Sequence, residues 1–272
     1  GILHGEQGAL SLSTGLSDMF VDPGAQEFVT NQAREESRHV HAFALYMRSR
    51  FGGEITPPTP TLNRILSSLV ASDIIYEKVI GMQMVIEGIA MGLFASMYQE
   101  ANDPLLKRLC QLVMTDESFH HRFGRIWAEE NVPGITEELR NQLEDYAREM
   151  FNDVLMNLVG ADQKIGLYRR CGIDPDFAVA AMNEAITDDT RRRFMQDGTN
   201  IFRTLIKTLW QGGLITERSR PYYANWIDMD EISGEGRWNV GDEIAEEGIA
   251  SLREINAGKR RVVRKVSEGA ST

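Results

Sequence analysis

Two copies of a short motif place a glutamate three residues before a histidine. The copies are Glu36-x-x-His39 and Glu117-x-x-His120, in a chain with five histidines in all. On an α-helix, residues three apart lie one turn apart on the same face, so each motif can direct a carboxylate and an imidazole at one point. These groups are ligands for divalent transition metals. One such pair alone is also common on an exposed helix, so a single copy would not distinguish a metal site from a surface pair.

Two further glutamates repeat the spacing. Glu6 lies 30 residues before Glu36, and Glu87 lies 30 residues before Glu117. Each interval fits the remainder of one helix, a turn, and the first half of an antiparallel helix. The chain therefore predicts two helix pairs, each with Glu on one helix and Glu-x-x-His on the other. Four carboxylates and two imidazoles that converge in a helical bundle form the ligand set of a dinuclear iron or manganese site.

Glu87 gives the strongest physical argument because its surroundings are apolar. It lies near the middle of the run from Val79 to Met97, one turn after Gln83. The run is long enough for a membrane span, but a carboxylate facing lipid is costly, so we expect a buried helix and no membrane contact. A buried carboxylate must be neutralised, paired or bound to metal. Two divalent cations would balance four carboxylates, whereas an ion pair with Arg122 or Arg125 is the alternative for Glu87.

Proline positions divide the chain into helical stretches. Thr59, Asp103 and Asp174 each precede a proline, which is typical of a helix start. Strand alternation is not evident, and the sequence predicts an all-α fold. The predicted helices span residues 2–19, 25–51, 60–100 with a break near 72–73, 104–131, 136–159, 175–186 and 188–211. Within the third, Gly88 and Gly92 are expected to allow close approach of a neighbouring helix.

The C-terminal part differs in character. We divide the chain into a helical domain, residues 1–213, and an extension, residues 214–272. The extension is predicted to be irregular and aromatic-rich over 214–240, to form a short amphipathic helix over 242–256, and to end in a basic tail.

Composition limits the class of protein. Hydrophobic residues make up 42% and charged residues 25%, which is ordinary for a globular protein. The net charge of −11 argues against a nucleic-acid partner. The two cysteines have neither metal-type spacing nor a disulfide framework, and no signal peptide is visible, so we expect a cytoplasmic protein. Because the chain begins at Gly1 rather than at Met, we expect residues upstream of it.

The complete pattern of six residues resembles the ferritin-like diiron carboxylate proteins. It is most similar to their oxygen-activating branch, which includes the ribonucleotide reductase small subunit, bacterial multicomponent monooxygenases, acyl-carrier desaturases and aminoarene N-oxygenases. The resemblance covers roughly residues 1–213. It implies a ferritin-like four-helix bundle with additional helices and a C-terminal extension. The metal ligands that it implies are Glu6, Glu36, His39, Glu87, Glu117 and His120.

The resemblance also implies roles for residues around the ligands. Carboxylates directly before ligating glutamates often hold a ligating histidine in this family, and Glu35 and Asp116 occupy those positions. His41 and His121 are expected off the ligand face, at the surface or behind the ligands, and His4 is expected to point elsewhere. The candidates for an apolar substrate pocket beside the metals are Phe43, Met82, Met91, Phe94 and Phe119.

Departures from the patterns of the oxygen-activating subfamilies narrow the choice among those subfamilies. Phe43 stands where the reductase subunit has its radical tyrosine, which excludes a tyrosyl radical there. Related ligand-binding oxidases form a valine–tyrosine crosslink. Ala9 and Met82 occupy the matching positions here, so that crosslink is unavailable. Met91 replaces a threonine that is usual in the monooxygenases, and Val113 replaces the extra histidine ligand of the N-oxygenases.

The expected function is O₂-dependent oxidation of a small organic or acyl substrate at two irons, with manganese or a mixed pair as the alternative metals. Hydroxylation, N-oxygenation and desaturation all stay open. Electrons would come from a ferredoxin or a reductase, and a homodimer is expected from the resemblance. The alternatives are a radical-generating subunit that uses a different residue, a non-catalytic iron-binding protein, and a metal-free helical interaction protein.

Overall fold

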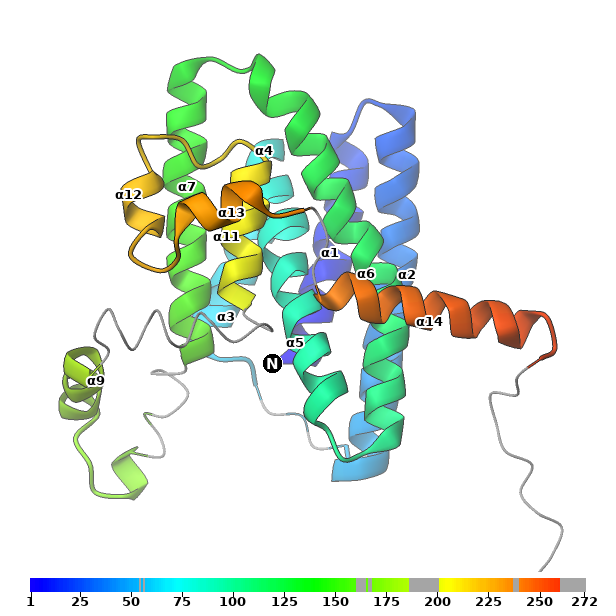
Figure 1. The fold of residues 1–272 in the computed structure, drawn as a ribbon. Coiled ribbons are helices and arrows are strands. Elements are labelled where there is room, and N and C mark those ends of the chain that lie inside the picture. The colour runs from blue at the N-terminus through cyan, green and yellow to red at the C-terminus, as the bar shows by residue number, and fades with distance from the viewer. Residues whose placement is uncertain are drawn as a thin grey trace, which may run out of the picture.

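A computed structural model describes residues 1–53, 55, 57–159, 165, 168–185, 201–236 and 240–259. Every regular element in these ranges is helical, which confirms the predicted all-α class. Four long helices form the part that carries the six candidate ligands (Figure 1). They are α1 (Ile2–Met19), α2 (Pro23–Phe51), α5 (Glu87–Glu100) and α6 (Pro104–Asn131).

The remaining elements connect or cover these four helices. Between α2 and α5 lie α3 (Pro60–Ala71), α4 (Ile75–Lys78) and the π-helix η1 (Val79–Ile86). After α6 come the 3₁₀ turn η2 (Val132–Gly134), α7 (Glu137–Val159), α9 (Pro175–Ala185), α11 (Ile201–Gln211), α12 (Arg220–Tyr223), α13 (Met229–Gly234) and α14 (Val240–Asn256). The predicted helix over 188–211 is observed from residue 201, and its residues 188–200 lie outside the described residues.

The predicted helix starts are confirmed. The side chains of Thr59, Asp103 and Asp174 each accept a hydrogen bond from a backbone N–H two or three residues later, with a proline at the first helical position. Such a cap satisfies one of the backbone donors that the first turn leaves without a partner. Asp22 caps α2 in the same way, so this helix begins at Pro23, two residues before its predicted start.

The predicted break near residue 72 is confirmed, but the chain beyond it contains a π-helix where an α-helix was expected. After α3 ends at Ala71, Lys78 donates a hydrogen bond from Nζ to the carbonyl of Val70 at 3.0 Å and so caps the end of that helix. The π-helix η1 then runs for eight residues and leads directly into Glu87. Such wider turns are rare and occur frequently at functional sites.

The two predicted glycine contacts are confirmed on the side of α5 that faces α11. A Cβ added at Gly92 would lie 2.5 Å from Ile201, and one added at Gly88 would lie 2.8 Å from Leu205. Both positions therefore permit α11 to lie closer to α5 than larger side chains would allow.

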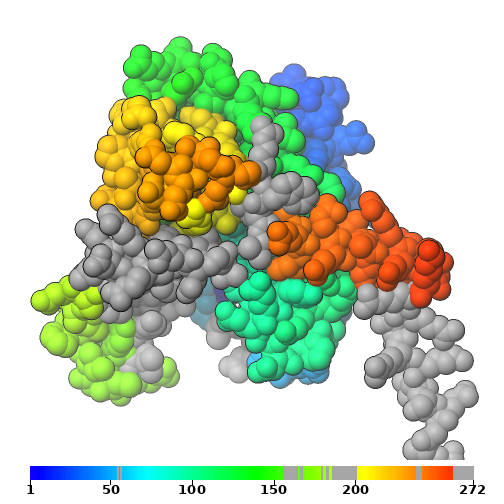
Figure 2. Space-filling view, in the orientation of Figure 1, coloured from blue at the N-terminus to red at the C-terminus, as the bar shows by residue number. Residues whose placement is uncertain are grey.

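The segment after residue 213 packs into the same cores as the bundle. Leu214, Tyr223 and Ile232 belong to the large core formed by η1, α7 and α11. Ile244 of α14 belongs to a second core with Phe94. Figure 2 shows α12 and α13 over one part of the visible face and α14 across α5 and α6. The segment 214–240 was predicted to be irregular, and this is wrong for the described helices α12 and α13, because apolar side chains fold them onto the core. The basic tail from residue 260 lies outside the described residues.

One stretch in the described residues, Ile75–Glu100, is long and apolar enough to cross a membrane. Its most apolar window has a mean hydropathy of 1.6, and 67% of that window is buried inside the protein. Such burial is typical of a central helix in a bundle, which is the place predicted for Glu87.

Candidate metal centre

The structure brings all six predicted ligands together in the interior. They come from four helices: Glu6 from α1, Glu36 and His39 from α2, Glu87 from the first residue of α5, and Glu117 and His120 from α6. None of the six is more than 5% exposed. Side chains separated by up to 114 residues of sequence thus share one buried space, as the two equal intervals predicted.

The ligand atoms form two overlapping groups. One consists of Glu6, Glu36, His39 and Glu117, and the other of Glu36, Glu87, Glu117 and His120. Within each group the ligand atoms all lie within 4.8 Å of one another. Glu36 and Glu117 belong to both groups, so their carboxylates are placed to bridge two cations, while each cation would have its own imidazole.

Both imidazoles turn the same nitrogen toward the carboxylates. His39 Nδ1 lies 3.0 Å from Glu117 Oε1 and 3.3 Å from Glu6 Oε2. His120 Nδ1 lies 3.0 Å from Glu117 Oε2 and 3.2 Å from Glu36 Oε1. The Nδ1 atoms are therefore the nitrogens that would bind metal.

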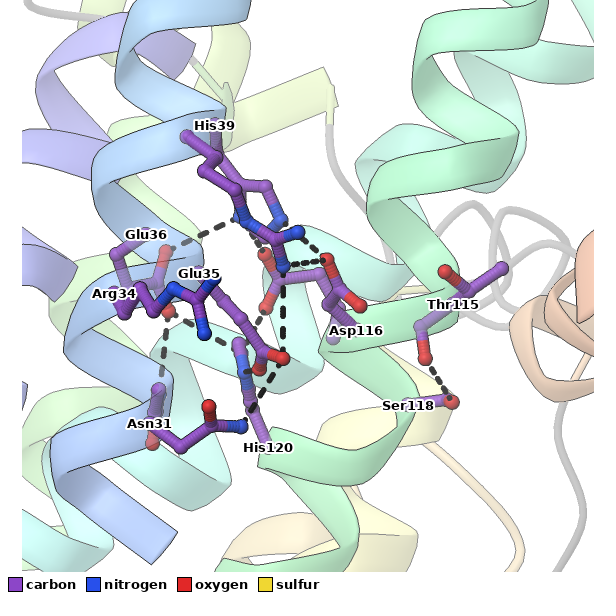
Figure 3. Close-up of polar contacts among 12 residues, drawn as sticks. Asn31, Arg34, Glu35, Glu36, His39, Thr115, Asp116, Ser118 and His120 are labelled. Carbon is purple, nitrogen blue, oxygen red and sulfur yellow. Dashed lines mark hydrogen bonds and ion pairs between the residues drawn. The ribbon is translucent and has the colours of Figure 1, made fainter.

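The other imidazole nitrogens contact the two carboxylates predicted to hold them, and they do so crosswise. Glu35 Oε2 on α2 lies 2.9 Å from His120 Nε2 on α6, and Asp116 Oδ2 on α6 lies 3.1 Å from His39 Nε2 on α2 (Figure 3). The Arg38 guanidinium lies 3.4 Å from Asp116 and 3.6 Å from Glu35. A proton held on Nε2 leaves the Nδ1 lone pair free for a cation.

Unpartnered atoms show that the arrangement fits a cation. His39 Nδ1 and Glu36 Oε2 are buried and lie 3.4 Å apart, and although carboxylate oxygens surround His39 Nδ1, neither atom has a partner in hydrogen-bond geometry. A buried polar atom without a partner is costly, and a divalent cation would satisfy both. Four carboxylates and two imidazoles suit iron or manganese, and a soft thiolate ligand is not among them.

The pKa shifts of the cluster indicate that its carboxylates lack positive charge nearby. Burial raises the pKa of Glu6 to about 8, and burial together with the nearby Glu117 and Glu36 carboxylates raises the pKa of Glu87 well above its usual value. Burial acts to lower the pKa of His120, but the carboxylates of Glu117, Glu35 and Glu36 together outweigh it and raise that pKa. Burial acts to raise the pKa of Glu117, yet His120, Glu87 and His39 together outweigh this effect and lower it. The metal-free cluster thus favours protons where cations would bind.

A cavity of about 260 Å³ lies next to the cluster, and its lining residues include Glu6, Glu36, Glu87 and Glu117. Of the predicted pocket residues, Phe94 lines it. The others that are buried pack into the surrounding cores: Phe43 stacks on Phe94 with ring centroids 5.5 Å apart, and Met82 and Met91 are core residues.

The prediction that Phe119 lines the pocket is wrong. Its side chain is 47% exposed, and the Arg122 guanidinium lies 5.6 Å from its ring centre. Because successive residues turn by about 100° around a helix, the residue directly before His120 points away from the ligand face.

The other histidines lie outside the cluster. His121 is buried, with Nε2 2.9 Å from the Thr208 hydroxyl of α11, and burial lowers its pKa to about 3. It is therefore a neutral packing residue between α6 and α11 rather than a surface group. His41 is exposed, and His4 Nδ1 lies 3.1 Å from Gln7 Oε1.

Two glutamines at the site were not predicted as site residues. Gln32 donates from Nε2 to Glu87 Oε1 at 2.8 Å and to Glu36 Oε1 at 3.2 Å. Gln83, in the π-helix, donates from Nε2 to Gln32 Oε1 at 2.7 Å. Both are fully buried. Each lies four residues before a ligand glutamate, so an amide one turn before a buried carboxylate is the signal that could have found them.

Comparison of the chain with protein-family models finds no match, and no curated protein matches it significantly. The interpretation of the site therefore rests on its own geometry.

Proposed function

We propose that the chain is a ferritin-like diiron carboxylate protein that uses O₂ to oxidise a small organic substrate. Two irons are the proposed metals, with manganese or a mixed pair as the alternative. Electrons would come from a ferredoxin or a reductase. The observation that carries the proposal is the pair of overlapping ligand groups that share Glu36 and Glu117. Two cations held side by side by shared carboxylates suit two-electron chemistry better than one isolated ion does.

When bound, two ferrous ions supply the electrons for O₂ reduction. The protein residues orient the ligands, bind the metal ions and give the substrate access to them. Glu35 and Asp116 fix the orientation of the imidazoles and hold the Nε2 protons. Glu36 and Glu117 would hold both cations, because each belongs to both ligand groups. The cavity beside the carboxylates gives a small molecule access to the reacting centre while its aliphatic wall disfavours water.

The cavity also supports an enzyme over a protein that only binds iron. A cation that is merely stored needs a route for ions, which polar side chains would line. Apart from the four glutamates, the described residues that line this cavity are aliphatic, aromatic or glycine. Such a lining suits an organic molecule better than a metal ion in transit.

Repeated redox cycling tests the proposal. The protein is loaded with two equivalents of Fe²⁺ without O₂, exposed to O₂, reduced again, freed of reductant and exposed again. We expect the iron to stay bound and to be reoxidised in every cycle. The Glu117→Ala variant should not support this, because it removes a carboxylate common to both ligand groups. Iron that is oxidised once and then released or no longer reducible would contradict the proposal and support non-catalytic iron binding.

A further inference from the structure

The cavity beside the carboxylates is built for a particular class of molecule. We infer that the substrate of the proposed oxidation is neutral and apolar, of the size of one ring or a short chain, rather than an organic acid or an amine. This inference rests on the proposed function and deepens it by naming the substrate class. It follows from the chemistry of the cavity wall, from its charge and from its volume.

One side of the cavity wall is aliphatic because it is formed by one face of α5 and by the last residue of η1. Ile86, Ala90 and Leu93 line it and recur at helical spacing. These three keep intermediate exposure on a helix whose neighbouring residues Ile89 and Phe94 are buried. The hydrophobic effect therefore favours displacement of water from this wall by an apolar molecule.

Three other helices also contribute to the cavity wall. Ala9 of α1, Leu62 of α3 and Val154 of α7 contribute further apolar side chains. Among the described lining residues, no side chain carries a nitrogen or a hydroxyl group. Gly1 also lines the cavity, and burial lowers the pKa of its amino group and so favours the neutral form. A substrate carboxylate would therefore lose its hydration without gaining a strong counter-charge from the described lining residues, which is costly.

The glutamates that line the cavity argue against a cationic substrate once metal is bound. The four carboxylates of the cluster would attract an ammonium group if they were uncompensated, but two bound divalent cations would balance their charge. An ammonium group in the loaded site would then lie beside two metal cations and an aliphatic wall, with no free counter-charge among the described lining side chains. A neutral molecule has neither cost.

Volume sets the size of the occupant. The cavity of about 260 Å³ exceeds the roughly 150 Å³ that accommodates benzene in an engineered apolar cavity, and it lies just below the range of drug-sized pockets. Small residues leave this space. A Cβ added at Gly5, which lines the cavity, would meet no atom within 4 Å. Gly5 therefore offers a position from which a larger side chain fills the cavity without a clash.

Binding of three matched probes tests the inference. Toluene, benzoate and benzylamine share a ring but differ in charge. They are titrated into the protein loaded with Zn²⁺, which has no redox chemistry, and the isoleucine methyl signals are followed by NMR. We expect saturable binding of toluene, with benzoate and benzylamine weaker by about tenfold or more.

Two glycine variants locate the binding. Gly5→Leu should weaken toluene binding by about tenfold or more because it fills the cavity. Gly234→Leu, at the end of α13 where an added Cβ also meets nothing within 4 Å, should bind toluene as the unaltered chain does. Circular dichroism establishes that both variants fold.

The outcomes separate this inference from the proposed function. No binding of toluene, equal binding of a charged probe, or unchanged binding in Gly5→Leu would overturn the inference, even if redox cycling succeeds. Selective toluene binding that Gly5→Leu removes supports the cavity assignment. If redox cycling then fails, the proposed oxidation is wrong although the apolar site is real.

Discussion

The two halves of the candidate metal centre have matching ligand motifs but different surroundings. Glu6 lies on a regular α-helix, next to the open space at Gly5, and contacts His39 Nδ1 at 3.3 Å. Glu87 follows a π-helix and accepts a hydrogen bond from Gln32 at 2.8 Å. A repeated motif in the sequence therefore does not produce two ligand groups with equivalent surroundings. We expect the position at Glu87 to be held in place before a cation arrives and the position at Glu6 to adjust on binding.

The largest effect should come from the residues that the halves share. Glu117→Ala removes a carboxylate from both ligand groups and leaves the Nδ1 atoms of both imidazoles without their nearest oxygen, so we expect the bound metal to fall from about two ions per chain to nearly none. Elemental analysis of the purified variant measures this. Glu27→Ala, on the exposed part of α2, is the matched control and should keep the metal of the unaltered chain. Retention of both ions in Glu117→Ala would contradict the bridging role.

Single-sided variants come next and test the comparison itself. Glu6→Ala should leave one tightly bound ion at the Glu87 position, because that half keeps its carboxylate and its amide donor. Glu87→Ala should also leave one ion, bound more weakly, at the Glu6 position. Titration with Mn²⁺ followed by electron paramagnetic resonance gives both affinities. Equal affinities in the two variants would show that the surroundings do not distinguish the halves.

A smaller effect is expected from the amide relay, the pair Gln83 and Gln32 that leads to Glu87. Gln32→Leu removes the donor to Glu87 and the longer hydrogen bond to the shared Glu36. We expect about 10- to 100-fold weaker binding of the cation at the Glu87 position, a loss typical of residues that orient ligands, and a smaller loss at the Glu6 position. Gln83→Leu should have a smaller effect, since Gln83 contacts Gln32 rather than a ligand. The same Mn²⁺ titration applies. Equal loss at the Glu6 position would indicate a general disturbance of the fold instead.

The smallest effect concerns the backbone behind the relay. A Cβ at Gly124 of α6 would lie 2.5 Å from Gln83 Cβ and 2.8 Å from its backbone carbonyl. Because backbone atoms cannot yield cheaply, Gly124→Ala should destabilise the metal-free protein by about 1–3 kcal/mol in urea unfolding. Gly134→Ala, where an added Cβ meets nothing within 4 Å, should change stability little. A Gly124→Ala protein as stable as the control would show that η1 and α6 are not tightly packed there.

The sequence predicted the parts of this molecule that depend on local rules. Side chains before prolines predicted the helix starts, and helical periodicity with equal intervals predicted which glutamates meet. The apolar residues around Glu87 predicted its burial.

The features that the sequence could not predict depend on packing between helices. The π-helix before Glu87 has no distinctive composition, and the contact of Gln83 with Gln32 joins residues 51 positions apart. The exposure of Phe119 results from its helical position, but its apolar character favoured a pocket. The folding of α13 onto the core depends on long-range contacts of residues such as Ile232.

A crystal structure of the iron-loaded protein, with data collected at the iron absorption edge, tests most directly whether two cations share Glu36 and Glu117. We expect two anomalous peaks, one among Glu6, Glu36, His39 and Glu117 and one among Glu36, Glu87, Glu117 and His120. A loaded crystal with iron bound elsewhere, or with this cluster still held together by protons alone, would contradict the proposed centre.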